Sequence, residues 1–169
     1  MDELRFFAPD EEFFEFTNFA PFPVLIEGLR WPTTEHYFQA AKFADAGLRE
    51  RIRTCPSPRA ALDLARQLHR HVRRDWMSVR VDVMRTALRA KFTQHPALGV
   101  LLVGTGDARL VEASPRDSFW GRGPRGTGAN VLGLLLVELR SELAASTAAD
   151  PADPVHRGGQ PGAADGDAS

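Results

Sequence analysis

The sequence predicts an α+β fold: a single compact, mostly helical domain over residues 1–145 with a small sheet, followed by a disordered C-terminal tail over 146–169. The 169 residues are 43% hydrophobic, which is enough to form one ordinary core. Short apolar runs interrupted by Pro and Gly dominate the first 31 residues and are typical of strands. Longer segments with helix-start signals follow, and the last segment is rich in Ala, Asp, Gly and Pro.

Strand-like segments occur at both ends of the predicted domain. In the N-terminal part they cover residues 4–7, 12–14 and 24–31, broken by Pro9, Pro21, Pro23 and Gly28. A further strand is expected over residues 109–113, directly after a Gly-Thr-Gly-Asp turn. These short segments account for the small sheet.

The helices are predicted from their start signals. Thr33 or Thr34 can cap a helix that reaches residue 43, and Ser57 followed by Pro58 is a cap with proline at the first helical position. Asp75 and Asn130 are the expected caps of two longer helices. The predicted helices cover residues 34–43, 48–54, 58–68, 76–93, 96–103 and 131–145.

Composition and charge exclude several classes of protein. The net charge is −1, and because the last 26 residues contribute −3, the remainder carries about +2, too little for bulk nucleic-acid binding. Cys55 is the single cysteine, so no intrachain disulfide forms, and no zinc spacing or other cofactor motif is present. No signal peptide and no run of about 18 apolar residues is found. We expect a cytoplasmic protein with no membrane partner and no metal or other cofactor.

The segment 31–43 combines a helix start with an unusual set of polar groups. At about 100° per residue, Glu35, Gln39 and Lys42 lie at about 0°, 40° and 340° around the helix and share one stripe. Because Glu35 falls in the first turn, the helix dipole favours its ionised form. Such a carboxylate is suited to stabilising a cation or activating water. The alternative is a surface glutamate with Lys42 as its salt-bridge partner.

Lysine is rare in this chain, with two lysines against 19 arginines. Lys91 lies within the apolar stripe of the predicted helix 76–93. A lysine there either extends to water along its stem or contacts a buried partner, an anion or substrate. Arginine cannot replace a compact ammonium that must titrate, so both lysines are candidate functional groups.

Two loops carry further candidates. The segment 117–130 contains Asp117, Trp120 and several glycines before a helix, and such glycine-rich turns allow backbone amides to contact an anion. The motif lacks the lysine and hydroxyl of a phosphate-binding loop. The segment 16–21 places Phe16 and Phe19 around Asn18, an arrangement that either holds a flat ring or fills the core from a loop.

Taken together, these motifs resemble the NADAR family, also called YbiA-like. The resemblance covers residues 5–143 in order. It is carried by FTNF (16–19), WPTTEHYFQAAKF (31–43), RRDW (73–76), MRTALRAKF (84–92), LVE (110–112), FWG (119–121), GAN (128–130) and LG (132–133). Ala65 stands where relatives usually have Gly, and Phe119 stands where Tyr is common, which removes a hydroxyl.

The resemblance implies an N-glycosidase domain over 1–145. Members cleave the bond between ribose 5-phosphate and an aminopyrimidine in reactive intermediates of riboflavin synthesis. Others are linked to removal of ADP-ribose, including from guanine in DNA. The implied partner is a small phosphorylated N-riboside or an ADP-ribosylated nucleic acid, and no obligate protein partner is evident.

The expected site follows from the chemistry of N-riboside hydrolysis, in which positive charge develops on the sugar. Glu35 would stabilise that charge or activate water, with Asp117 as partner carboxylate or ribose ligand and Lys42 as a third catalytic group. The predicted substrate-binding residues are Asn18, Phe19, Trp31, Gln39, Arg66, Trp76, Lys91, Trp120, Gly121, Gly128 and Asn130. Among them Trp76 and Trp120 would hold the base between them. The two asparagines would bind its edge or the ribose hydroxyls. Arg66, Lys42 and the amides of 126–130 would hold phosphate.

Three alternatives stay open at this point. Lys42 or Lys91 could form a Schiff base with the opened ribose, which requires a neutral lysine. The chain could bind ADP-ribose or a nucleotide without turnover. It could also be a structural or interaction protein, in which case Glu35→Gln would leave every phenotype unchanged.

Overall fold

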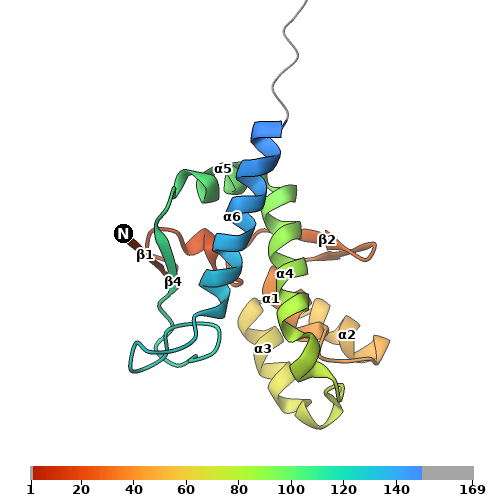
Figure 1. The fold of residues 1–169 in the computed structure, drawn as a ribbon. Coiled ribbons are helices and arrows are strands. Elements are labelled where there is room, and N and C mark those ends of the chain that lie inside the picture. Colours follow the sequence, from red (N-terminus) through yellow and green to blue (C-terminus); the bar gives the residue numbers. More distant parts are fainter. Residues whose placement is uncertain (1, 150–169) are drawn as a thin grey trace, which may run out of the picture.

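A computed structural model describes residues 2–149 of the chain (Figure 1). Along the sequence, its elements are β1 (Glu3–Phe6), η1 (Phe14–Phe16), β2 (Val24–Ile26), β3 (Leu29–Trp31), α1 (Thr34–Ala40), α2 (Ala46–Arg53), α3 (Pro58–Gln67), η2 (His69–His71), α4 (Trp76–Gln94), α5 (Pro96–Gly104), β4 (Arg109–Glu112) and α6 (Val131–Ala149). The predicted mostly helical α+β fold is confirmed. Its strands form two small sheets.

The first sheet joins the two ends of the domain, because β1 pairs in parallel with β4 and brings Phe6 opposite Glu112. The second is an antiparallel hairpin of β2 and β3 (Figure 1). The strand-like segment predicted over 24–31 is thus two strands joined by a turn. The chain reverses there because Glu27 and Gly28 both take positive φ angles, 54° and 75°, as a tight two-residue hairpin turn requires.

The strand predicted over residues 12–14 is wrong. Phe13 has a φ angle of 64°, and the segment turns into η1 rather than extending. Phe16 is fully buried there and its ring packs 5.8 Å from that of Phe6 and 5.7 Å from that of Phe92. Aromatic residues favour strands where their side chains pack on the face of a sheet. Here Phe16 packs into the hydrophobic core from a 3-10 turn instead.

The helix caps divide into two groups. Thr33 accepts a hydrogen bond from the His36 amide and Ser57 accepts one from the Ala60 amide, as predicted. Asp75 does not cap α4, because both of its carboxylate oxygens accept hydrogen bonds from Arg73, at 2.6 and 2.7 Å. An exposed cation two residues away therefore replaces the backbone amides as the partner of this carboxylate.

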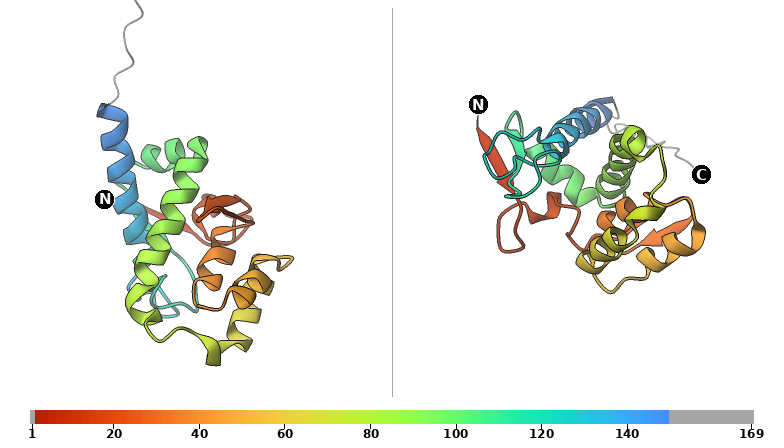
Figure 2. Two further views of the ribbon diagram at one scale, coloured as in Figure 1. Left: turned by 90° about the vertical axis from the view of Figure 1, so that its right-hand side faces the viewer. Right: turned by 90° about the horizontal axis from the view of Figure 1, so that it is seen from below.

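Two long helices, α4 and α6, lie side by side along the length of the domain (Figures 1 and 2). Two ion pairs join them on the outside, Arg85 with Glu138 at 3.4 Å and Arg89 with Glu142 at 2.7 Å. Helix α5 packs against both of them at one end. The α2 and α3 helices pack against α1 at the other end of the domain.

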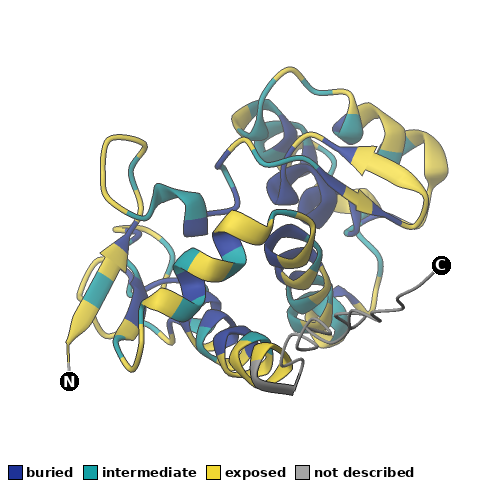
Figure 3. Ribbon diagram, turned by 90° about the horizontal axis from the view of Figure 1, so that it is seen from above, coloured by how far each residue is buried: buried dark blue, intermediate teal, exposed yellow. Residues whose placement is uncertain are grey.

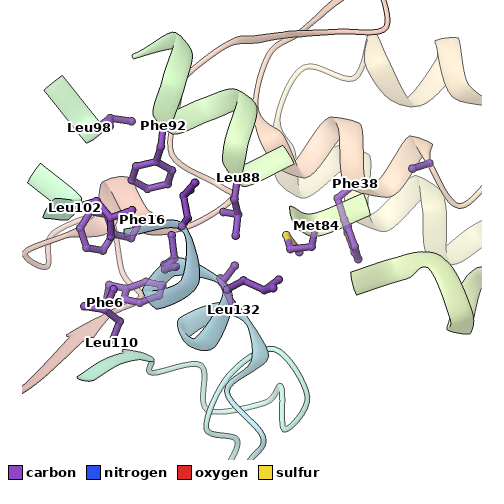
Figure 4. Close-up of a cluster of buried hydrophobic side chains, with 14 of the residues drawn as sticks. Phe6, Phe16, Phe38, Met84, Leu88, Phe92, Leu98, Leu102, Leu110 and Leu132 are labelled. Atoms are coloured by element: carbon purple, nitrogen blue, oxygen red, sulfur yellow. The ribbon is translucent and has the colours of Figure 1, made fainter. Parts of the chain in front are cut away.

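Hydrophobic side chains form two clusters, and α1 lies between them. The first cluster is built from β1, η1, α4, α5, β4 and α6, and Phe38 of α1 joins it (Figure 4). The second lies among β2, β3, α2 and α3, and Tyr37 and Ala40 of α1 join that one. All seven residues of α1 are therefore buried, in contrast to the exposed outer faces of the longer helices (Figure 3). Its polar residues, Glu35 and Gln39 among them, are therefore largely removed from water.

Helix α6 continues to Ala149, beyond the predicted domain end at residue 145. The rest of the predicted tail, residues 150–169, lies outside the described part of the chain. Within residues 2–149, no helix combines the length and apolarity that a membrane crossing requires.

The contact between α6 and β4 yields a stability prediction. A methyl group at Gly133 would overlap the Leu110 carbonyl oxygen, so Gly133→Ala should lower the free energy of unfolding by about 1–3 kcal/mol. Gly104 has open space around it, so Gly104→Ala is the matched control and should change stability by less than about 0.5 kcal/mol. Urea unfolding followed by circular dichroism measures both. Equal stabilities of the two variants would contradict the close α6–β4 contact.

Candidate active site

Glu35 occupies the first turn of α1 and is 6% exposed. Its backbone amide donates a hydrogen bond to the Asn18 carbonyl at 3.1 Å. Its carboxylate oxygen Oε1 accepts a hydrogen bond from Gln39 Nε2 at 2.7 Å. The shared stripe of Glu35 and Gln39 is thus confirmed, and the alternative of a solvated surface glutamate is excluded.

The pKa of Glu35 is raised to about 6, mainly because burial removes water from the carboxylate. The Gln39 hydrogen bond and the positive charges of Lys42 and Arg66 lower this pKa, and the charge of Asp117 raises it. The helix dipole favours the ionised form, as sequence analysis stated, but desolvation outweighs it. With a pKa of about 6 the carboxylate is still largely ionised at pH 7.

Lys42 lies two residues after the end of α1 and is half-buried. Its ammonium lies 5.7 Å from the ring centroid of Phe38 and 5.9 Å from that of Trp76. Burial lowers the pKa of Lys42, the charge of Arg66 lowers it further, and the charge of Glu35 opposes both. The positive charge thus lies over aromatic rings and close to the Glu35 carboxylate.

The two tryptophans do not form an open slot. Phe38 packs between them, with its ring centroid 5.1 Å from Trp76 and 5.4 Å from Trp120 in edge-on geometry. The structure therefore differs from the predicted sandwich of a base between Trp76 and Trp120. Phe38, three residues after Glu35, fills the space between the two indole rings. Trp120 is half-buried and keeps part of its surface accessible, whereas Trp76 is 8% exposed.

Asp117 shapes the loop after β4. Its oxygen Oδ1 accepts hydrogen bonds from the amides of Phe119 and Trp120, at 2.8 and 2.7 Å. An aspartate that accepts hydrogen bonds from the amides two and three residues ahead has a structural role in the turn. The negative charge of Asp117 still acts on Glu35, whose pKa it raises.

The glycine-rich loop is closed on itself. Four of the five amides over 126–130 donate to carbonyls of the same loop, and the first two amides of α6 donate to the carbonyls of Phe119 and Trp120. They are not free to bind the predicted phosphate. Gly121 and Gly128 serve close packing, because a methyl group at Gly128 would overlap the Gly121 carbonyl oxygen.

Both predicted asparagine ligands are occupied inside the protein. Asn18 accepts a hydrogen bond from the Thr34 hydroxyl at 2.9 Å and its amide nitrogen lies 3.1 Å from the Met84 sulfur. Asn130 accepts from the Glu112 amide and donates to the Leu110 carbonyl, at 2.9 and 2.8 Å. Its side chain therefore ties α6 to β4 and does not cap the helix.

Two further predicted ligands lie in the core. Trp31 is fully buried and its indole donates to the Ile26 carbonyl. Lys91 is also fully buried and its ammonium donates to the Thr17 carbonyl at 2.8 Å. Burial lowers the pKa of Lys91 to about 7. Of the two outcomes considered for this lysine, the contact with a buried partner is the one observed.

Three predicted residues remain: Arg66, Phe19 and Gln39. Arg66 is exposed on α3 and lies 3.7 Å from Asp63, and its charge acts on Glu35. Phe19 is half-buried beside Asn18. Gln39 is 3% exposed, and its carbonyl oxygen Oε1 has no hydrogen-bond partner among the described residues.

Sequence reasoning missed Glu112. The last residue of β4 is half-buried, and its oxygen Oε2 is buried without a hydrogen-bond partner in the part of the chain that the structure describes. The pKa of Glu112 is raised to about 7, first by burial and then by the charges of Asp117 and Glu35. The available signal was an acidic residue that ends an apolar strand just before the loop of Asp117.

These carboxylates do not form a metal centre. Within residues 2–149, no group of three or more His, Cys, Asp or Glu side chains is arranged to hold a metal ion. A cavity of about 220 Å³ lies on the glycine-rich loop, lined by Ser118, Arg122, Pro124, Arg125, Thr127, Gly128 and Ala129.

Comparison with known proteins agrees with this architecture. Residues 5–144 match the family described as the NADAR domain. N-glycosidase YbiA of Escherichia coli is 47% identical over 141 residues, covering 83% of this chain and 88% of that protein. A riboflavin biosynthesis protein of Vibrio vulnificus is 41% identical over 140 residues, covering 83% of this chain and 38% of that protein. The NMR structure of E. coli YbiA superimposes with a TM-score of 0.84 at 43% identity, covering 92% of each chain. The chain therefore belongs to the NADAR family.

Proposed function

We propose that this chain is an N-glycosidase that hydrolyses phosphorylated N-ribosides, with reactive aminopyrimidine ribose 5-phosphates of riboflavin synthesis as its substrates. Relatives named N-glycosidase YbiA and riboflavin biosynthesis protein support this class of reaction. The observation that carries the proposal is the buried Glu35 carboxylate, held by Gln39 and accompanied by the positive charges of Lys42 and Arg66.

The chemistry follows from where charge develops. When the bond between the anomeric carbon and the base nitrogen breaks, the sugar acquires positive charge. An ionised Glu35 in a site of low dielectric stabilises that charge more strongly than water would. The same carboxylate accepts a proton from the attacking water, a role typically worth about 10²–10⁴-fold in rate.

The groups around Glu35 match the other parts of an N-riboside. Lys42 and Arg66 provide the positive charge for a 5-phosphate. The amides of 126–130 were also predicted to hold it, but four of these five donate to carbonyls of their own loop. The unpaired Gln39 oxygen is an acceptor for a ribose hydroxyl. Trp120 offers the accessible aromatic surface for the base.

A second candidate substrate is an ADP-ribose conjugate, including ADP-ribosylated guanine in DNA. The cavity of about 220 Å³ beside the Asp117 turn favours it, because Arg122 and Arg125 in its lining carry the charge that a second phosphate requires. A ribose monophosphate does not need this cavity.

The proposal is tested by Glu35→Gln, which keeps the side-chain shape and removes the charge. We expect kcat for base release to fall about 10²–10⁴-fold. Burying the charged form is unfavourable, so at pH 7 the variant should be at least as stable to heat as the wild type. Base release is measured by chromatography, in parallel from an aminopyrimidine ribose 5-phosphate and from ADP-ribosylated guanine DNA.

Glu12→Gln is the matched control, since Glu12 is exposed on the N-terminal segment, and it should leave kcat unchanged. A wild-type chain that releases no base from either substrate would rule out the hydrolase. Wild-type binding without release would instead support the nucleotide-binding alternative.

The pH dependence of the reaction gives a separate prediction. Because Glu35 acts in its ionised form, kcat/KM should fall tenfold per pH unit as the pH drops below about 6. An unperturbed glutamate would place this decline near pH 4.5. A profile that stays flat from pH 7 down to pH 5 would contradict the role of the buried carboxylate.

The Schiff-base alternative predicts a covalent adduct that direct hydrolysis does not form. We expect borohydride treatment during turnover to leave the protein mass unchanged, because Lys91 is engaged with Thr17 and Lys42 serves as a charge. Mass spectrometry of the intact protein reports the result. An added mass that disappears in Lys42→Met would establish the lysine route.

A further inference from the structure

Glu112 is fixed in place by its backbone. It is the last residue of β4, its amide donates to the Asn130 side chain at 2.9 Å, and its carbonyl accepts from the Arg122 amide at 2.9 Å. The strand, the start of α6 and the glycine-rich loop therefore all converge on this residue. These hydrogen bonds fix the backbone position from which the Glu112 side chain extends, as a preorganised catalytic group requires.

Space for the Glu112 carboxyl is provided by the missing side chain of Gly121. A Cβ atom at Gly121 would lie 2.6 Å from Glu112 Oε2, so any larger residue would displace the carboxyl group. Despite this close packing, Oε2 has no hydrogen-bond partner among residues 2–149. A buried carboxyl oxygen without a donor is unfavourable and is rare in native structures.

A second unsatisfied group lies beside Glu35, whose charge acts on Glu112. The oxygen Oε1 of Gln39 is buried without a donor in the described part of the chain, in a side chain that is 3% exposed and hydrogen-bonded to Glu35. Within the described residues, Gln39 Oε1 and Glu112 Oε2 are the two buried side-chain polar atoms that lack a partner. A ligand that brings hydroxyl and amino groups supplies donors to both.

The neighbourhood of Glu112 is negative. Asp117 and Glu35 are the charged groups that act on it, and both disfavour its ionised form. Oδ1 of Asp117 is held by the amides of Phe119 and Trp120, whereas Oε2 of Glu112 has no hydrogen-bond partner among residues 2–149.

We propose that Glu112 is a second catalytic residue of this site, the acid that protonates the departing base while Glu35 activates water. The inference rests on the proposed N-glycosidase function. The Glu112 carboxylic acid gives its proton to the base nitrogen as the C1–N bond breaks, and the bonding electron pair stays on nitrogen. Water adds its oxygen to C1 and gives a proton to Glu35. The products are free base and ribose 5-phosphate, and the proton on Glu35 returns to Glu112 through solvent.

The two carboxyl groups have protonation states suited to these roles. Burial and the charges of Asp117 and Glu35 all raise the pKa of Glu112. At Glu35 burial also raises the pKa, but the Gln39 hydrogen bond and the charges of Lys42 and Arg66 oppose that rise. Glu112 is therefore the group that keeps its proton to higher pH. Paired carboxyl groups whose surroundings separate their pKa values are the general pattern of acid and base catalysts in glycoside hydrolysis.

The test is the pH profile of kcat/KM for an aminopyrimidine ribose 5-phosphate in the wild type and in Glu112→Gln. The wild type should give a narrow bell that declines above about pH 7 as Glu112 loses its proton. Glu112→Gln should lower kcat/KM at least about 10²-fold and lose the alkaline decline, since its rate no longer depends on this proton. Glu112→Asp keeps a carboxylic acid and should retain the decline.

Glu12→Gln is the control for a charge change outside the site and should keep the wild-type bell. A Glu112→Gln profile that is lowered but unchanged in shape assigns Glu112 a structural role and overturns the inference. A wild-type profile with no decline between pH 7 and pH 9 overturns it without recourse to any variant. A wild-type chain that cleaves no N-riboside overturns the proposed function itself, which distinguishes the two failures.

Discussion

The hydrogen bond from the Glu35 amide to the Asn18 carbonyl is the interaction on which the site depends. It anchors the first turn of α1 to the loop after η1, and the Thr34 hydroxyl strengthens the same junction through the Asn18 side chain. Lys91 of α4 stabilises the same loop by donating a hydrogen bond to the carbonyl of Thr17, the residue before Asn18. Three polar contacts therefore hold a charged helix start inside the protein, where it would not remain on hydrophobic grounds alone.

The burial of α1 explains the unusual electrostatics. Because hydrophobic clusters lie on both of its sides, the Glu35 carboxylate loses most of its water. Among the described residues it retains a single side-chain hydrogen bond, from Gln39. Its pKa rises even though two cations act on it. Lys91 shows that a displaced pKa does not by itself indicate function, since this lysine is fully enclosed and bonded to the backbone. The surroundings of Glu35 differ from those of Lys91 in that two buried oxygens, Gln39 Oε1 and Glu112 Oε2, have no hydrogen-bond partner among the described residues.

Local signals predicted the helices well, because caps such as Thr33 and Ser57 act within four residues. The errors arose where distant residues compete for the same group. Asn18 and Asn130 have the chemistry of substrate ligands, yet they bond to α1, α4 and β4, contacts that depend on the tertiary fold. The loop 126–130 likewise closes on its own carbonyls. Glu112 was missed because its position beside Asp117 depends on how the loop folds back over the end of β4.

The central claim is that Glu35 is a buried carboxylate facing the sugar of a bound riboside. Carbon-13 NMR titration of its carboxyl group, with and without ribose 5-phosphate, tests this most directly. The account predicts a midpoint near pH 6 in the free protein and a change in the Glu35 signal when ribose 5-phosphate is added. A midpoint near the ordinary value of 4.5, with no response to ribose 5-phosphate, would contradict it.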